Sequence, residues 1–166
     1  MKLVRSIARM GSVPWLLLFT FALSSCVSSP EARSARFIEN GKNQLKKKDA
    51  QRAILEFQNA LKATPGNAEA YYQLAIAYLA VGDGVRAGAS LRQALQINPK
   101  HRAAQLLIAK LMASTNDPNY LQDAQKRLQA LLQDSPNDPV ELYALALSEL
   151  KLNEPGDAMR DLALAR

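Results

Sequence analysis

The stretch SARFIENGKNQLKKKDAQRAILEFQNALKATPGN, residues 34–67, decides the fold, because residues 68–101 repeat its pattern at an offset of 34. Six kinds of position match between the two copies: Phe37 with Tyr71, Gly41 with Ala75, Ala53 with Ala87, Phe57 with Leu91, Ala60 with Ala94, and Pro65 with Pro99. A fixed period of this length is typical of stacked supersecondary units. The sequence therefore predicts a row of similar units in place of one closed core.

Each unit has the pattern of two helices joined by a turn. In residues 68–101, Leu74 and Tyr78 recur at helical spacing, residues 82–84 read Gly-Asp-Gly, and Ala87 and Leu91 recur after them. Small residues are expected where two helices approach closely, and large residues where they fill the space between helices. A proline then ends the second helix.

This pattern resembles the tetratricopeptide repeat (TPR), a helix–turn–helix of about 34 residues. Gln44 departs from it, since an aromatic residue is expected at that position of the first unit. The resemblance implies an all-α protein, a superhelical solenoid of antiparallel helix pairs.

Four units are predicted, and two of them are irregular. They cover residues 34–67, 68–101, 102–138 and 139–166. The third is three residues longer, and its extra residues lie in a predicted turn, Ser114–Tyr120, that is rich in turn-forming residues. The fourth keeps its register through Ala165 and stops before the closing proline, so we expect the repeat array to continue or to self-associate at this end.

The first 25 residues have the composition of a secretory signal peptide. Three basic residues precede Val13–Leu23, which is apolar apart from one threonine. At 11 residues this apolar run is too short to span a bilayer. We therefore expect residues 1–25 to be a signal peptide that precedes the repeats.

The end of this segment, Leu23-Ser24-Ser25-Cys26, is similar to the bacterial lipobox. The resemblance implies lipidation at Cys26, a mature chain that begins there, and a short linker over residues 26–33. Two or three acyl chains on one residue give stable membrane anchoring. Since Val27, and no aspartate, follows the cysteine, the resemblance favours the outer membrane, with the protein facing the periplasm. An uncleaved anchor, or an ordinary signal with an incidental cysteine, is the alternative.

Charge and composition argue against several classes of function. The net charge is +6, but three of the basic residues lie in the first 25, which leaves 18 basic against 15 acidic residues. That excess is small for a nucleic-acid-binding face. His101 and Cys26 are the only residues of their kinds, so neither a disulfide, a common zinc site nor a Cys–His pair is expected. The sequence thus predicts no enzyme, no cofactor and no metal.

In proteins that resemble this one, the first helices of the units line a concave groove. That resemblance assigns the partner-binding groove to Ile38, Lys42, Tyr72, Gln73, Ile76, Leu106, Lys110, Tyr143 and Leu147. The set is largely apolar, with two aromatic residues and two lysines, which suits an amphipathic or apolar segment of a protein or peptide whose acidic groups contact the lysines. The carboxylate clamp of chaperone-binding relatives is absent. For Ile76 and Leu106, packing between helices is an equally good interpretation.

Together these features predict a membrane-anchored TPR scaffold for protein–protein interaction in a bacterial envelope assembly or secretion system. Two alternatives stay open. One is the N-terminal TPR arm of a longer enzyme, a transferase or peptidase. The other is an unanchored periplasmic chaperone.

Overall fold

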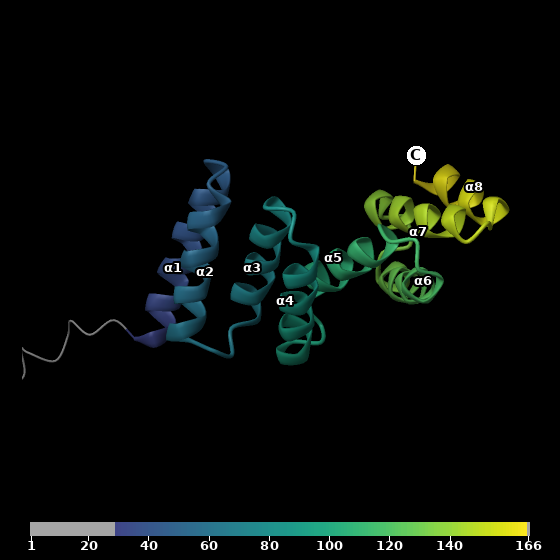
Figure 1. Cartoon of the computed structure of the whole chain (residues 1–166). Helices are drawn as coiled ribbons and strands as arrows, with labels where there is room; N and C mark the ends of the chain where they lie inside the picture. The colour runs from purple at the N-terminus through teal and green to yellow at the C-terminus, as the bar shows by residue number, and fades with distance from the viewer. Residues whose placement is uncertain (1–28, 166) are drawn as a thin grey trace, which may run out of the picture.

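A computed structural model describes residues 29–165, which form eight helices and contain no strand. The helices are α1 (Pro30–Lys46), α2 (Ala50–Ala63), α3 (Ala68–Ala80), α4 (Gly84–Ile97), α5 (Arg102–Ala113), α6 (Pro118–Asp134), α7 (Pro139–Lys151) and α8 (Pro155–Leu164). They stack in chain order as four antiparallel pairs (Figure 1). This arrangement confirms the predicted all-α solenoid. Within residues 29–165, no helix combines the length and apolar character needed to cross a bilayer.

The turn inside three of the four pairs contains one residue with a left-handed backbone. Lys48, Gly82 and Asn153 have φ values of 61°, 78° and 64°, and they occupy the same position of the first, second and fourth units. Glycine adopts this conformation without steric cost and asparagine tolerates it, whereas a lysine there is strained. The third pair, whose unit is three residues longer, makes its turn without such a residue.

Two boundaries differ from the sequence prediction, and the reason is the same in both. The Ser29 hydroxyl accepts a hydrogen bond from the Ala32 N–H, and Pro30 begins α1, so the predicted linker over residues 26–33 is helical from Pro30 on. Asp117 likewise caps α6, and the predicted turn Ser114–Tyr120 ends at residue 117. A capping side chain followed by proline is a strong helix start.

Within the first pair, α1 and α2 approach each other where a glycine faces an aromatic ring. A Cβ atom added to Gly41 would overlap the ring of Phe57, which is fully buried. The other units carry alanine and leucine at the matching positions: Ala75 with Leu91, Ala109 with Leu128, and Ala146 with Leu162. The larger ring of Phe57 is therefore accommodated by the smaller residue opposite.

Most of the buried apolar residues form two clusters that meet at α5. The first joins α1 to α5 and includes Phe57, Leu91 and Ile108. The second joins α5, α6 and α7 and includes Ala109 and Leu128. Since Ile108 and Ala109 are neighbours, α5 packs one face on each cluster and links the two halves of the solenoid.

Two cationic side chains hold the fourth pair against the third. Arg102, on α5, donates to Oε1 of the buried Glu141 on α7 at 2.6 Å. Lys151, at the end of α7, donates from Nζ to the carbonyl oxygens of Ala113, Ser114 and Thr115 at 2.9–3.0 Å. Carbonyls at the end of a helix have no intrahelical partner, and a cation there is favourable.

The close approach at Gly41 leads to a stability prediction. Gly41→Ala gains about 1 kcal/mol of helix propensity but inserts a methyl group into the Phe57 ring, which costs about 1–3 kcal/mol. We expect urea denaturation to show a net loss of about 0–2 kcal/mol in the free energy of unfolding.

Two variants control this experiment. Gly156→Ala adds a Cβ atom that meets nothing within 4 Å, so it is expected to be neutral or stabilising. In a Phe57→Leu background, which restores the alanine–leucine pair of the other units, Gly41→Ala is expected to lose its cost. An equal cost in both backgrounds would show that the ring is not the cause.

Candidate protein-binding surface

The first helix of each pair presents one face away from its partner helix, and we name this face of α1, α3, α5 and α7 the first-helix surface. It carries most of the residues that the sequence assigned to the groove. In its first half these side chains are engaged in contacts within the protein. On α7, and at Lys110 on α5, they are exposed to solvent.

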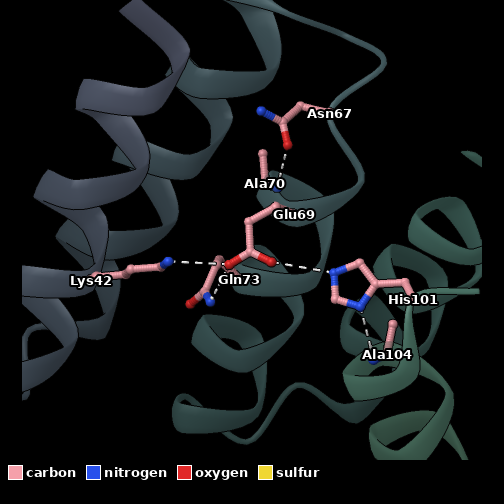
Figure 2. Close-up of polar contacts among 7 residues, drawn as sticks. All are labelled: Lys42, Asn67, Glu69, Ala70, Gln73, His101 and Ala104. Carbon is pink, nitrogen blue, oxygen red and sulfur yellow. Dashed lines mark hydrogen bonds and ion pairs between the residues drawn. The ribbon is translucent and has the colours of Figure 1, made fainter. Parts of the chain in front are cut away.

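A hydrogen-bonded network centred on Glu69 joins α1, α3 and the start of α5 (Figure 2). Lys42 Nζ, on α1, lies 3.2 Å from Glu69 Oε1, on α3. Gln73 Nε2 donates to the same oxygen at 2.8 Å. His101 Nε2, just before α5, lies 3.2 Å from Glu69 Oε2. We call these four residues the Glu69 network.

The network sets the ionisation of its central carboxylate. Partial burial by itself would raise the pKa of Glu69. Hydrogen bonds from Gln73 and Lys42, the charge of Lys42 and the bond from His101 outweigh that effect and lower the pKa below its usual value. Glu69 is therefore a charged centre on this surface.

His101 has two roles, and its tautomer follows from them. Its Nδ1 atom accepts a hydrogen bond from the Ala104 N–H at 3.3 Å, so it caps α5. An accepting Nδ1 carries no proton, which places the proton of the neutral ring on Nε2, where it is donated to Glu69. Sequence reasoning treated His101 as a lone histidine at a repeat junction and missed both contacts.

Tyr72 packs against this histidine. The two ring centroids are 5.0 Å apart, with the planes tilted by 43°. Tyr72 is half-buried and also contacts the first core cluster. Burial, followed by the charge of Glu69, raises the pKa of its hydroxyl. Part of its predicted contact area is thus used within the protein, and its removal is expected to cost stability.

The apolar residues assigned to the first half of the groove are also engaged in packing. Ile38 is buried and belongs to the first core cluster, so its assignment to an accessible groove is corrected: α1 turns this side chain inward between helices. Ile76 and Leu106 are half-buried, and Leu106 packs against the second cluster.

The fourth pair supplies an exposed apolar stripe. Val140, Tyr143, Leu147 and Leu150 lie on α7 and are 48%, 62%, 37% and 50% exposed. Spacings of three and four residues place them on one face over three turns of the helix. Tyr143 and Leu147 were assigned from the sequence. Val140 and Leu150 were missed, although the same spacing includes them. We call these four residues the α7 stripe.

Lys110 is exposed on α5, and α5 packs directly against α7. Unlike Lys42, it makes no ion pair within the part of the chain that the structure describes. In residues 29–165, no cluster of three or more His, Cys, Asp or Glu side chains is arranged to hold a metal ion. Lys110 is thus an available cation near the apolar contact area of α7.

Comparison with known families gives one match over most of the chain. The family described as "Cytochrome c-type biogenesis protein H TPR domain" matches residues 22–164. Among characterised proteins, the human protein O-mannosyl-transferase TMTC3 is 29% identical over 129 residues, which are 75% of this chain and 14% of that protein. The chain therefore spans about one-seventh of the length of this relative.

Solved structures show the same fold at low sequence identity. MamA from Desulfovibrio magneticus RS-1 is 18% identical with a TM-score of 0.73, over 80% of this chain and 73% of that one. YrrB, described as a TPR protein with an unusual peptide-binding site, is 18% identical with a TM-score of 0.69, over 80% and 66%. The first TPR of Spaghetti (RPAP3), bound to an HSP90 peptide, is 18% identical with a TM-score of 0.69, over 76% and 98%.

The double role of His101 leads to a second prediction. His101→Ala removes the cap of α5 and the contact with Glu69, and is expected to lower the free energy of unfolding by about 1 kcal/mol. His101→Asn restores a capping side chain of the kind that Asn67 provides for α3, and is expected to recover most of that loss. Urea denaturation of both variants measures the difference. If the asparagine variant is as unstable as the alanine variant, capping is not the source of the effect.

Proposed function

The chain belongs to the TPR family described for cytochrome c-type biogenesis protein H, and from this premise we propose that it is a membrane-anchored scaffold that binds a protein partner on its first-helix surface. The family is named after a biogenesis protein, which favours a role in assembly over catalysis. Two TPR structures similar to this chain are described with a peptide or a peptide-binding site. That precedent supports a protein or peptide as the partner here.

The α7 stripe carries this proposal. Its four exposed side chains extend over three turns of α7. Contiguous exposed apolar area of this kind marks interaction sites on soluble domains. Tyr143 is suited to be an anchor, because tyrosine combines apolar contact area with a polar tip and loses little conformational entropy on binding.

The lysines of the surface indicate what charge the partner segment should carry. Lys42 is already paired with Glu69, so an acid from the partner would have to displace that carboxylate. Lys110 is exposed and has no such competitor among the described residues. We therefore expect an amphipathic segment whose apolar face contacts the α7 stripe and whose acidic residue contacts Lys110.

One observation favours a second candidate function. The similarity to a human O-mannosyl-transferase covers only a small part of that enzyme, which is the relation expected if these repeats are an arm of a longer transferase. The intact mass of the native protein separates the two candidates, because an enzyme requires a further domain. An unanchored periplasmic chaperone is the remaining alternative, and lipid labelling tests it.

We also propose export and lipidation at Cys26, which lies outside the described residues, with the protein anchored to the outer membrane and facing the periplasm. The lipobox-like end of residues 1–25 supports this proposal. Because α1 begins at Pro30, Val27–Ser29 would separate the lipidated residue from the first helix, a span of at most about 14 Å. The repeats would then lie close to the bilayer.

A third prediction tests the binding surface. The partner is first captured by crosslinking and pull-down from detergent-solubilised membranes. Tyr143→Ala with Leu147→Ala should then weaken its binding by about 1–4 kcal/mol, the range for aromatic anchors, without lowering the melting temperature. Tyr120→Ala is the matched control, since Tyr120 is 51% exposed but lies on α6, a second helix. If the melting temperature of the double variant drops while its affinity is unchanged, Tyr143 and Leu147 serve in packing and not in binding.

A fourth prediction tests the anchor. Cys26→Ala removes the thiol that would carry the lipid. The variant should therefore incorporate no palmitate and should no longer fractionate with the membranes. Ser25→Ala keeps a small residue before the cysteine and is expected to retain both. Continued labelling of the Cys26→Ala protein would exclude lipidation at this position.

A further inference from the structure

A shallow cavity of about 290 Å³ lies between α6 and α8, with α7 beneath it. It is separate from the first-helix surface, since it is bounded by the second helices of the last two pairs. Its walls are about half apolar, and the apolar part includes Leu132, Leu145 and Leu164. Glu149, Asp161 and Arg160 supply its charged groups. We call it the Glu149 cavity.

Glu149 lies where the second and third repeats have residues in or packed against the first core cluster and the first repeat has Gln44. It occupies the repeat position of Tyr78 and Met112, and it is only 3% exposed. Its Oε2 atom is buried and has no hydrogen-bond partner. A buried carboxylate oxygen without a partner is unfavourable, so a group that supplies a hydrogen bond or a positive charge would stabilise it.

Arg160, which lines the cavity, and Lys151, two residues after Glu149, are already engaged in other contacts. Arg160 pairs with Asp157 at 2.9 Å and with the buried Asp161 at 3.4 Å. Lys151 donates to the carbonyls at the end of α5. The cavity therefore combines leucine side chains with a buried carboxylate that makes no ion pair within residues 29–165.

A cation with an aliphatic stem fits this chemistry. Lysine and arginine bury their methylene groups along apolar surface and place the charge at the tip. A divalent metal fits less well, because no group of three or more metal-binding side chains is present within residues 29–165. We propose that the Glu149 cavity binds a lysine or arginine side chain of a partner protein, with the stem against the leucines and the charge at Glu149 and Asp161. This inference rests on the proposed function only in taking the partner to be a protein.

The ionisation of Glu149 agrees with this assignment. Burial, followed by the charges of Asp161, Asp157 and Glu154, raises its pKa to about 7, with the charge of Arg160 acting in the opposite direction. On α6, the polar residues that line the cavity are Gln129 and Gln133, and both are neutral. A bound cation stabilises the ionised form, so binding should strengthen as the pH rises through 7. If only the ionised form binds, the apparent affinity at pH 8 is about tenfold that at pH 6.

The experiment titrates the full chain with N-acetyl-lysine methylamide and follows amide chemical shifts by NMR. Saturable shifts in α7 and α8, about tenfold tighter at pH 8 than at pH 6, are expected. The norleucine analogue has the same stem without the charge and should not bind. The arginine analogue distinguishes the two cations. Glu149→Gln should abolish the lysine titration, whereas Asp157→Asn, in which the altered side chain is 53% exposed, should leave it within about twofold.

Folding of the Glu149→Gln protein is checked by its melting temperature. A carboxyl group whose pKa is raised on folding destabilises the protein above its unfolded pKa, so the variant should be at least as stable as the parent at pH 8 and lose that advantage near pH 4. Equal binding of the norleucine analogue, unchanged binding to Glu149→Gln, or no saturable shift would each overturn the inference. Tyr143→Ala should not affect this titration, so a failure here is distinct from a failure of the proposed function.

Discussion

The close approach of α1 and α2 at Gly41 and Phe57 is the constraint on which the rest of the solenoid depends. A helix pair stays together only if each large side chain has a small one opposite, because interiors are packed to a density that leaves no room for an extra methyl group. Glycine against phenylalanine satisfies that condition in the first pair, and alanine against leucine occupies the matching positions of the other pairs. With the second helix fixed on one side, the opposite face of each first helix becomes available for binding.

The junctions between pairs depend on polar residues that serve two helices at once. Asn67 caps α3 through Oδ1 and donates from Nδ2 to the Ser34 hydroxyl on α1 at 3.2 Å. His101, 34 residues later, caps α5 and bonds back to Glu69 on α3. At the third junction Asp138 only caps its helix, and Arg102 bridges to Glu141 instead. Each junction therefore fixes the start of one first helix relative to the one before it.

The fold could be predicted from the sequence because small residues and prolines recur at a fixed offset, and this spacing survives without knowledge of tertiary contacts. The helix starts at Pro30 and Pro118 were not predicted, because the repeat period places both segments outside helices. Both starts nevertheless have a local capping signal, Ser29-Pro30 and Asp117-Pro118. The assigned surface was less predictable. Whether Ile38 is buried, or whether His101 meets Glu69, depends on how neighbouring pairs stack, and no local pattern encodes it.

The polar contacts between neighbouring pairs differ in how strongly dissolved salt acts on them. The amide–hydroxyl contact of Asn67 and Ser34 has no formal charge, and the Arg102–Glu141 pair is shielded because Glu141 is almost fully buried. The Lys42–Glu69 pair is the exposed one, with 37% and 42% of its side chains accessible to solvent. Counter-ions screen exposed pairs far more than buried ones. Changes in ionic strength therefore act mainly on the contact between α1 and α3, while the joint between the third and fourth pairs, beside the α7 stripe, keeps its geometry across a wide range of salt.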